Sequence, residues 1–226
     1  HQRMMPRLQA LLWDVDGTLA DTEQNGHRLA FNAAFAEAQL AWHWNNSTYS
    51  DLLAVTGGIE RMRAWAKQQH LKSNQNKSKN QSDPLAESEL EELLIRLQAS
   101  KQKHYRRILK EQLFPLRPGV ERLLLEARAA GLCQVLVTSS GRNSVEALLQ
   151  HHPQLNNCWK HWICAEDVQT KKPHPEAYVL ALKKLGLPAA AAMAIEDSAQ
   201  GLAAARGAGL KVLITAKAKP GLEGAA

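Results

Sequence analysis

The sequence predicts an α/β protein built on a doubly wound parallel sheet, with an all-helical domain inserted after the first strand. Apolar runs suited to buried strands alternate with helical segments through residues 106–226. Three of these helices are followed by glycine, at Gly131, Gly186 and Gly209, just before the next strand. Glycine there readily adopts the left-handed conformation that ends a helix, and repeated helix–Gly–strand units indicate parallel strands joined by helices. By contrast, residues 22–105 show only helical periodicity.

The first strand is predicted at Leu8–Trp13, an apolar run of the kind that parallel sheets bury on both faces. The elements that follow the inserted segment are short and alternate regularly, which predicts a sheet whose functional residues gather in loops at the carboxyl ends of the strands. The predicted helices are Val120–Ala130, Ser144–Gln150, Glu176–Leu185 and Leu202–Ala208, and the predicted strands are Gln134–Val137, Trp162–Ala165, Ala192–Ile195 and Val212–Thr215.

The inserted segment is predicted to form a helical cap domain. Its apolar residues recur three and four positions apart, the spacing that gives a helix one apolar face. The clearest sets are Leu29, Phe31, Ala34, Phe35 and Ala38, and, after Pro84, Leu90, Leu93, Leu94 and Leu97. Between these sets, Lys72–Ser82 is polar and without periodicity, which predicts a mobile loop. The predicted domains are therefore a core of residues 1–21 and 106–226 and a cap of residues 22–105.

The amino-acid composition narrows the classes of protein to which this chain could belong. The chain is 45% hydrophobic and 22% charged, as in ordinary globular enzymes, and no apolar run reaches the ~20 residues of a membrane span. Three irregularly spaced cysteines argue against a zinc site and favour a reducing compartment, either the cytoplasm or a plastid stroma after removal of a transit peptide. The net charge of +6 raises nucleic-acid binding as an alternative, but no aromatic residues are interleaved in the densest basic run. A monomer that acts on a small anionic molecule, without nucleic acid or membrane, is expected.

The segment Asp14–Thr18 directly follows the first strand and carries the strongest functional signal. Residues i and i+2 of an extended chain face the same side, so Asp14 and Asp16 should project together beyond the strand. Two such carboxylates repel each other unless a cation or a proton lies between them. Gly17 allows the backbone to approach an anion and to donate its N–H group. The alternative is an Asp-Gly turn that only ends the strand.

Three further polar groups follow other predicted strands. Thr138–Ser140 supplies hydroxyls, Lys171–Pro173 supplies a cation, and Glu196–Asp197 supplies two more carboxylates. Each is weak alone, because serine commonly caps helices and lysine pairs are common on surfaces. At the carboxyl edge of one parallel sheet, however, they would meet. Together they predict a site for Mg²⁺ and a phosphate group.

The sequence resembles the haloacid dehalogenase superfamily of phosphatases, whose Rossmann-like core carries four such motifs in this order. The matching segments are LLWDVDGTLADTE, LVTSS, KKPHPEAY and AIEDSAQGLAAARGAGL. Within the superfamily, the sequence resembles the CbbY-like branch of xylulose-1,5-bisphosphate phosphatases on the segments DTEQNGHRLAFNAAF, LLAVTGGIERMR and PLRPGV. The resemblance runs from about Leu8 to Thr215.

The resemblance implies a Mg²⁺-dependent enzyme that hydrolyses a small sugar phosphate through an aspartyl-phosphate on Asp14. Asp16 would act as general acid and then base, Ser139 would donate a hydrogen bond to the phosphoryl group, and Lys172, with Lys171 as the alternative, would neutralise its charge. The implied Mg²⁺ ligands are Asp14, the backbone carbonyl of Asp16 and Asp197, with Glu196 beside the ion or acting through a water molecule. The implied substrate contacts are Gly17, Thr138, Ser140 and Arg142 in the core and Glu23, His27, Thr56, Gly57, Gly58 and Arg61 in the cap.

The sequence departs from the branch at two places. Ile59 stands where relatives carry a cationic residue, so a contact with a distal phosphate is expected from Arg61 first, then from Arg142 or Arg63. The sequence also stops soon after Thr215, where relatives continue, which suggests a truncated end. Xylulose-1,5-bisphosphate is the expected substrate. A β-phosphoglucomutase, a phosphoglycolate-type phosphatase and, from another class, a phospho-accepting signalling domain are the alternatives.

Overall fold

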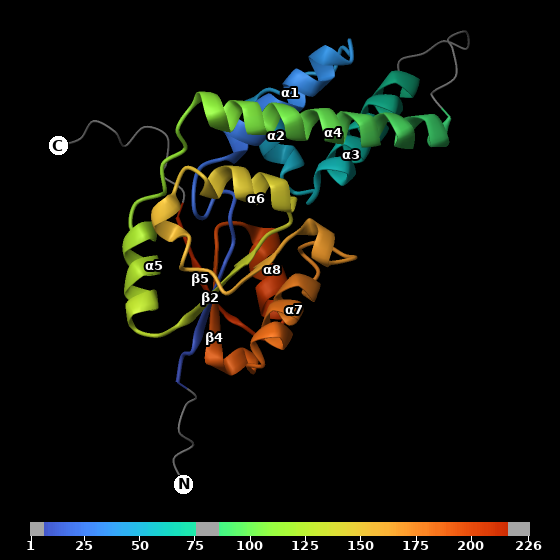
Figure 1. Ribbon diagram of the computed structural model, residues 1–226. Helices are drawn as coiled ribbons and strands as arrows, with labels where there is room; N and C mark the ends of the chain where they lie inside the picture. Colours follow the sequence, from blue (N-terminus) through green and yellow to red (C-terminus); the bar gives the residue numbers. More distant parts are fainter. Residues whose placement is uncertain (1–6, 76–85, 217–226) are drawn as a thin grey trace, which may run out of the picture. The chain divides into compact units, whose positions relative to one another are not determined.

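The computed structural model describes residues 7–75 and 86–216 (Figure 1). The chain divides into two compact units. One unit comprises His1–Ala20, Pro115–Arg142 and His152–Ala226, and the other comprises Asp21–Phe114 and Asn143–His151. The second unit extends beyond the predicted cap of residues 22–105, because the helix Glu87–Glu111 continues past residue 105. The predicted domain boundaries stay a prediction. No helix in the described part of the chain is long and apolar enough to cross a membrane.

The first unit is built on a five-stranded sheet in which every neighbouring pair of strands is parallel. The order of the strands across the sheet is β3-β2-β1-β4-β5, so the chain builds outward in both directions from β1. The strands are β1 (Ala10–Trp13), β2 (Cys133–Val137), β3 (His161–Ile163), β4 (Ala192–Glu196) and β5 (Lys211–Ile214).

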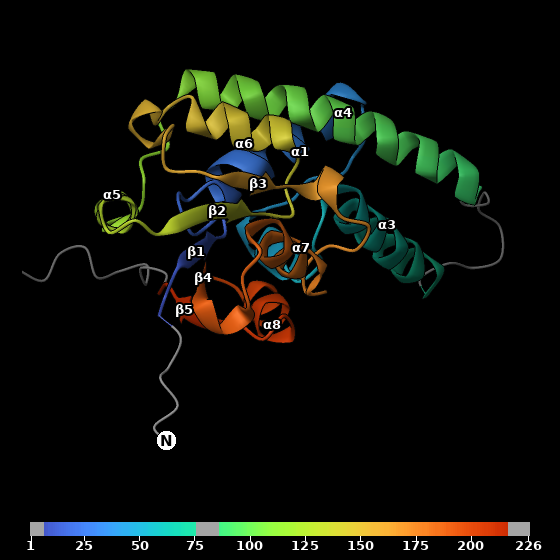
Figure 2. The same ribbon diagram turned by 60° about the horizontal axis from the view of Figure 1, so that its bottom comes forward.

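Helices cover both faces of this sheet. Helices α7 (Glu176–Leu185) and α8 (Ala199–Gly207) lie together on one face, and α5 (Val120–Ala129) lies on the other (Figures 1 and 2). The interface with α7 and α8 is apolar, because the strands bury small and β-branched side chains there. Gly186 ends α7 in the left-handed conformation, with φ of 66°, as the sequence predicts. The predicted class, a doubly wound parallel α/β sheet with a helical insert, is confirmed.

Short elements complete the connections in this part of the chain. The 3₁₀ helices are η2 (Pro153–Leu155), η3 (Ala165–Asp167) and η4 (Ala189–Ala191). Helix α6 (Arg142–Leu149) follows β2, and it belongs to the second unit from Asn143 onward. The strand predicted at Trp162–Ala165 ends earlier, at Ile163, because Ala165 begins η3.

The second unit is helical, as predicted. Besides the part of α6 from Asn143 onward, its elements are the π-helix η1 (Glu23–His27) and the α-helices α1 (Arg28–Glu37), α2 (Asn46–Leu52), α3 (Gly58–Gln75) and α4 (Glu87–Glu111). Its core is rich in aromatic side chains, among them Phe31, Phe35 and Trp44. Leu29 was predicted on the apolar face of α1, but it is 38% exposed. Of the loop predicted at Lys72–Ser82, residues 72–75 form the end of α3, and residues 76–82 lie outside the described residues.

Candidate active site

The site forms at the carboxyl end of β1, where the order of the strands reverses. Trp13 pairs with Leu136 of β2 on one side and with Ile195 of β4 on the other. The backbone N–H of Asp14 then donates to the carbonyl of Ile195 at 3.0 Å. The loops that follow β1, β2 and β4 therefore leave the sheet at one edge, as expected for the switch point of a doubly wound sheet.

Asp14 is the buried centre of this edge. Lys172 Nζ donates to Asp14 Oδ1 at 3.0 Å, and Thr18 Oγ1 donates to Asp14 Oδ2 at 2.9 Å. The same Thr18 hydroxyl lies 3.1 Å from Asp197 Oδ1, so its single proton is shared between the two carboxylates. Asp14, Lys172 and Asp197 come from segments far apart in the sequence, and the sheet brings them together as predicted. Thr18 lay within the quoted motif but was assigned no role.

Lys172 is a buried cation shared by two carboxylates. Its ammonium group donates to Asp14, to Glu196 Oε1 at 2.6 Å and to the backbone carbonyl of Val137 at 2.8 Å. Burial alone would lower the pKa of Lys172, but Asp14 and Glu196 outweigh burial and raise the pKa above its ordinary value. Lys172 is therefore charged throughout the physiological range, with all three of its N–H donors engaged.

Glu196 has no solvent exposure, and Tyr178 holds it from α7. The Tyr178 hydroxyl donates to Glu196 Oε1, the same oxygen that accepts from Lys172. Burial and the charge of Asp14 raise the pKa of Glu196 to about 7, although Lys172 and Tyr178 act in the opposite direction. Burial also raises the pKa of Tyr178 well above its ordinary value, so this hydroxyl remains a donor. Sequence reasoning missed Tyr178, because an aromatic residue on the inner face of a helix reads as ordinary core.

The carboxylates of this edge fit a divalent cation. Asp14, Glu196 and Asp197 each offer a ligand atom within 4.8 Å of the others. Glu196 Oε2 is buried and accepts no hydrogen bond from the described residues, which leaves it able to complete the shell of a cation. Gly17, with φ of 85°, is required beside them, because a Cβ atom there would lie 2.2 Å from Asp197 Oδ2. Carboxylate oxygens are the ligands that a hard ion such as Mg²⁺ prefers, so these three residues suit it.

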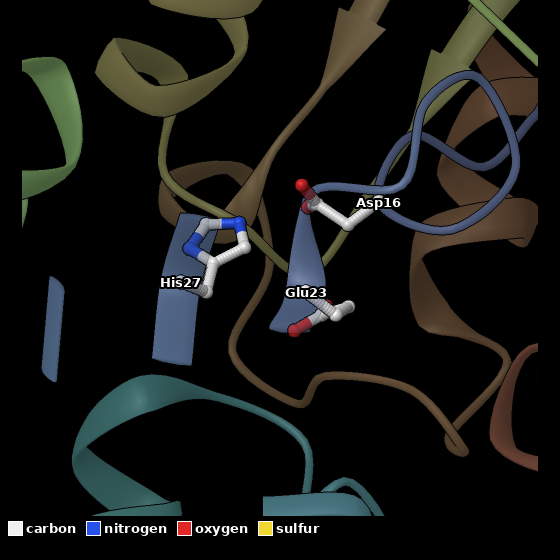
Figure 3. Close-up of side chains that lie close together, drawn as sticks. All are labelled: Asp16, Glu23 and His27. Carbon is white, nitrogen blue, oxygen red and sulfur yellow. The ribbon is translucent and has the colours of Figure 1, made fainter. Parts of the chain in front are cut away.

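The hydroxyls that follow β2 form a turn against Asp16. The backbone N–H of Ser140 donates to Thr138 Oγ1 at 3.0 Å, and Ser140 Oγ donates to Asp16 Oδ2 at 2.6 Å. Ser139 lies half-buried between these two residues. Figure 3 shows Asp16 on the loop that leaves β1. The structure thus brings Ser140 and Asp16 together, although sequence reasoning assigned Ser140 to the substrate.

Arg142, at the start of α6, is held by acidic residues of η3. Its backbone N–H donates to both carboxylate oxygens of Glu166, at 3.0 and 3.1 Å. Its guanidinium donates to Asp167 Oδ2 at 2.7 Å and to the carbonyl of Trp162 at 3.2 Å. The positive end of the helix therefore already faces carboxylates of the protein. The predicted contact between Arg142 and a distal phosphate stays a prediction.

Within the helical unit, Glu23 is linked to Arg61 through Tyr49. Tyr49 donates its hydroxyl to Glu23 Oε2 at 2.6 Å, and Arg61 Nη1 donates to the Tyr49 oxygen at 3.2 Å. Arg61 Nε lies 3.1 Å from the carbonyls of both Leu52 and Val55. Arg61 is 9% exposed, so this guanidinium is part of the packed interior of the unit. Tyr49 is a second residue that sequence reasoning missed.

His27 projects from the same π-helix as Glu23 (Figure 3). Its Nδ1 lies 2.8 Å from the Nζ atom of the buried Lys101, and its ring stacks on Tyr105 with 4.0 Å between the centroids. Since an ammonium group only donates, Nδ1 of His27 is the acceptor. No sequence signal identified Lys101, which lies in the middle of α4.

The other predicted cap residues are Thr56 and Gly57, in the loop before α3, and Gly58, the first residue of α3. Gly57 has φ of 95°, a conformation that favours glycine, whereas a Cβ atom on Gly58 would lie 2.2 Å from Gln98 Oε1 and would displace the end of that side chain. Arg63 forms a bidentate ion pair with Glu91, at 2.6 and 2.8 Å. Their contacts with a substrate stay a prediction.

Residues 8–209 match the family model of haloacid dehalogenase-like hydrolases. The chain belongs to this family. Two relatives of this hydrolase are Protein CbbY (plasmid) of Cupriavidus necator, 41% identical over 92% of this chain and 78% of the relative, and Protein CbbY of Rhodobacter capsulatus, 39% identical over 92% and 85%. The hydrolase is therefore a CbbY-like phosphatase, as predicted.

Solved structures agree with this assignment. CbbY from Rhodobacter sphaeroides in complex with phosphate is 33% identical and superposes with a TM-score of 0.79, over 93% of this chain and 87% of that one. A mutant of the same protein, in complex with xylulose-(1,5)bisphosphate, gives the same values. A β-phosphoglucomutase from Clostridium difficile, 20% identical with a TM-score of 0.72, shares the fold of this hydrolase.

Proposed function

We propose that this hydrolase is a Mg²⁺-dependent phosphatase of a small phosphorylated sugar and that xylulose-1,5-bisphosphate is its substrate. The observation that carries the reaction is the buried Asp14 carboxylate at the switch point, held between Lys172 and Thr18. The support for the substrate is the likeness to CbbY, since one CbbY structure contains this bisphosphate.

In the first step, a carboxylate oxygen of Asp14 attacks the phosphorus atom of the substrate. The bond between phosphorus and the sugar oxygen breaks, and protonated Asp16 delivers its proton to that oxygen, so the sugar leaves as a neutral alcohol. Lys172 is already 3.0 Å from Asp14 and would offset the charge of the incoming phosphoryl group. Ser139 would donate a hydrogen bond to an oxygen of that group.

In the second step, water hydrolyses the aspartyl-phosphate. Asp16, now a carboxylate, takes a proton from the water as it attacks phosphorus. The bond between phosphorus and Asp14 breaks, which releases inorganic phosphate and restores the Asp14 carboxylate. Asp16 regains in this step the proton that it gave in the first, so the cycle closes without another donor.

Asp14, Glu196, Asp197 and the backbone carbonyl of Asp16 would hold the metal. When bound, Mg²⁺ offsets the repulsion between these carboxylates and the anionic substrate and polarises a phosphoryl oxygen. Thr18 and Lys172 orient the Asp14 carboxylate from opposite oxygens, so its rotation is set before the substrate arrives. Tyr178 and Lys172 likewise hold Glu196 Oε1.

Release of inorganic phosphate from a panel of sugar mono- and bisphosphates, with Mg²⁺ and with EDTA, tests this proposal. We expect turnover only with Mg²⁺ and the highest kcat/KM for xylulose-1,5-bisphosphate. Asp14→Asn is the control, because the amide is nearly isosteric but not nucleophilic. Full activity in EDTA, or Asp14→Asn activity above a few per cent of wild type, would refute the mechanism. Equal kcat/KM for hexose monophosphates would refute only the substrate.

A further inference from the structure

The turn after β2 presents two adjacent serines, and their surroundings differ. Ser140 uses its backbone and its side chain within the protein. Its N–H donates to Thr138 Oγ1 at 3.0 Å, its C=O accepts from the N–H of Ala165 at 2.9 Å, and its hydroxyl donates to Asp16 at 2.6 Å. Ser140 is therefore tethered to β2, to η3 and to the loop after β1.

Arg142, two residues after Ser140, adds further hydrogen bonds to η3. Glu166 accepts the backbone N–H of Arg142, and Asp167 accepts both the guanidinium of Arg142 and the backbone N–H of Cys164. These hydrogen bonds join the start of α6 to the segment that follows β3, next to the turn that carries Ser140. The position of the Ser140 backbone is therefore fixed, and the hydrogen bond to Asp16 gives its hydroxyl a direction.

The partner of that hydroxyl is the residue that exchanges protons in the proposed reaction. The backbone at Asp16 is itself fixed by a bridge to Ala20, with Gly17 N donating to the Ala20 carbonyl at 2.8 Å. The hydrogen bond from Ser140 to Asp16 Oδ2 constrains the rotation of the Asp16 side chain, and general acid–base catalysis depends on that orientation.

We propose that Ser140 is a positioning residue that orients Asp16 for proton transfer to the leaving oxygen. It does not bind the transferred phosphoryl group. This inference rests on the proposed function, which makes Asp16 the general acid. It separates the roles of the two serines, with Ser139 serving the phosphoryl group and Ser140 serving the proton.

The choice of leaving group distinguishes a role in protonating the leaving oxygen from a role in binding the transferred phosphoryl group. A sugar alkoxide leaves only if it is protonated, whereas a p-nitrophenolate leaves without a proton. Ser140→Ala removes only the hydroxyl and keeps both backbone hydrogen bonds of the turn. We expect it to lower kcat/KM for the sugar phosphate by about tenfold or more and to leave kcat/KM for p-nitrophenyl phosphate nearly unchanged, since a positioned acid contributes about 10²–10⁴-fold. The ratio kcat/KM is used because it reports steps only up to the first irreversible one, before water attacks.

Three controls accompany this variant. Ser140→Thr keeps the hydroxyl and should recover most of the sugar-phosphate activity. Ser139→Ala, on the same turn, should lower kcat/KM for both substrates by the same factor. Inhibition by inorganic phosphate should weaken in Ser139→Ala and not in Ser140→Ala.

An equal loss on both substrates in a folded Ser140→Ala protein, or weakened inhibition by phosphate, would overturn the role of Ser140 while leaving the phosphatase assignment intact. A wild-type enzyme without activity on either substrate would overturn both. A circular-dichroism melt of each variant establishes that it is folded.

Discussion

The substitution Gly201→Ala tests the buried active-site network without replacing a charged residue. Gly201 lies in the first turn of α8, where a Cβ atom would be 2.0 Å from Glu196 Oε2 and 2.1 Å from Glu196 Cδ. Real Cβ contacts are not shorter than 3.0 Å, so Gly201→Ala must displace the Glu196 carboxylate by about 1 Å. Glu196 cannot move outward, because it is fully buried.

The expected cost follows from the hydrogen bonds that this displacement breaks. Glu196 Oε1 accepts from Lys172 at 2.6 Å and from Tyr178. Hydrogen bonds to charged groups contribute about 1.5–3 kcal/mol each, or about 3–6 kcal/mol for the two. Replacing glycine by alanine in a helix ordinarily gains up to about 1 kcal/mol. The net expectation is a loss of about 2–5 kcal/mol in the free energy of unfolding, with a large fall in kcat.

Urea unfolding in EDTA at pH 7 measures the change in the free energy of unfolding. Phosphate release in the presence of Mg²⁺ measures kcat separately. The matched control is Ala203→Gly, at an exposed position of the same helix, which should cost about 1 kcal/mol through helix propensity alone. If Gly201→Ala instead stabilised the protein by about that amount and kept its kcat, the described position of Glu196 beneath α8 would be wrong.

Three further predictions concern other buried groups. Lys172→Met leaves two buried carboxylates without their cation, so it should abolish turnover and cost about 3–5 kcal/mol in urea unfolding. Because a raised pKa makes protonation of Glu196 favour the folded state, that cost should be smaller at pH 5 than at pH 8. Burial raises the pKa of Cys164 to about 12, so iodoacetamide at pH 8 should alkylate the less buried Cys133 well before Cys164, as read by mass spectrometry. Arg61→Ala should raise KM for a bisphosphate and a monophosphate alike, because Arg61 is linked to Glu23 through Tyr49; a rise in KM for the bisphosphate alone would instead support the predicted contact of Arg61 with the distal phosphate.

Much of the fold could be predicted because its signals are local. The strands consist mostly of apolar residues, and Gly186 marks the end of α7 where the backbone adopts a positive φ. Errors fell at element ends. Lys72 reads as loop from composition, yet it lies in the last turn of α3, because a helix already packed on a partner continues through polar residues. Leu29 reads as core but is exposed, since spacing alone does not state how wide the buried stripe is.

The core of the site could be predicted for a different reason. Parallel strands end at one edge of a sheet, and β1 lies next to β4, so Asp14 and Asp197 lie close together and Lys172 reaches Asp14 from the segment after β3. The groups that hold these residues could not be predicted in the same way. Tyr178 and Tyr49 lie on helices, where only the packing of one element on another decides whether a hydroxyl reaches a carboxylate.

Arg61 already has partners within the protein, and its predicted contact with a distal phosphate stays a prediction. Helix α2 ends at Leu52, and the last carbonyls of a helix have no partner within it and carry partial negative charge. Arg61 Nε meets two carbonyls at this end, those of Leu52 and Val55, both at 3.1 Å. Its Nη1 then reaches Tyr49, which donates to Glu23. The backbone itself therefore supplies partial negative charge to this arginine, and a hydrogen-bonded link through Tyr49 joins Arg61 to Glu23.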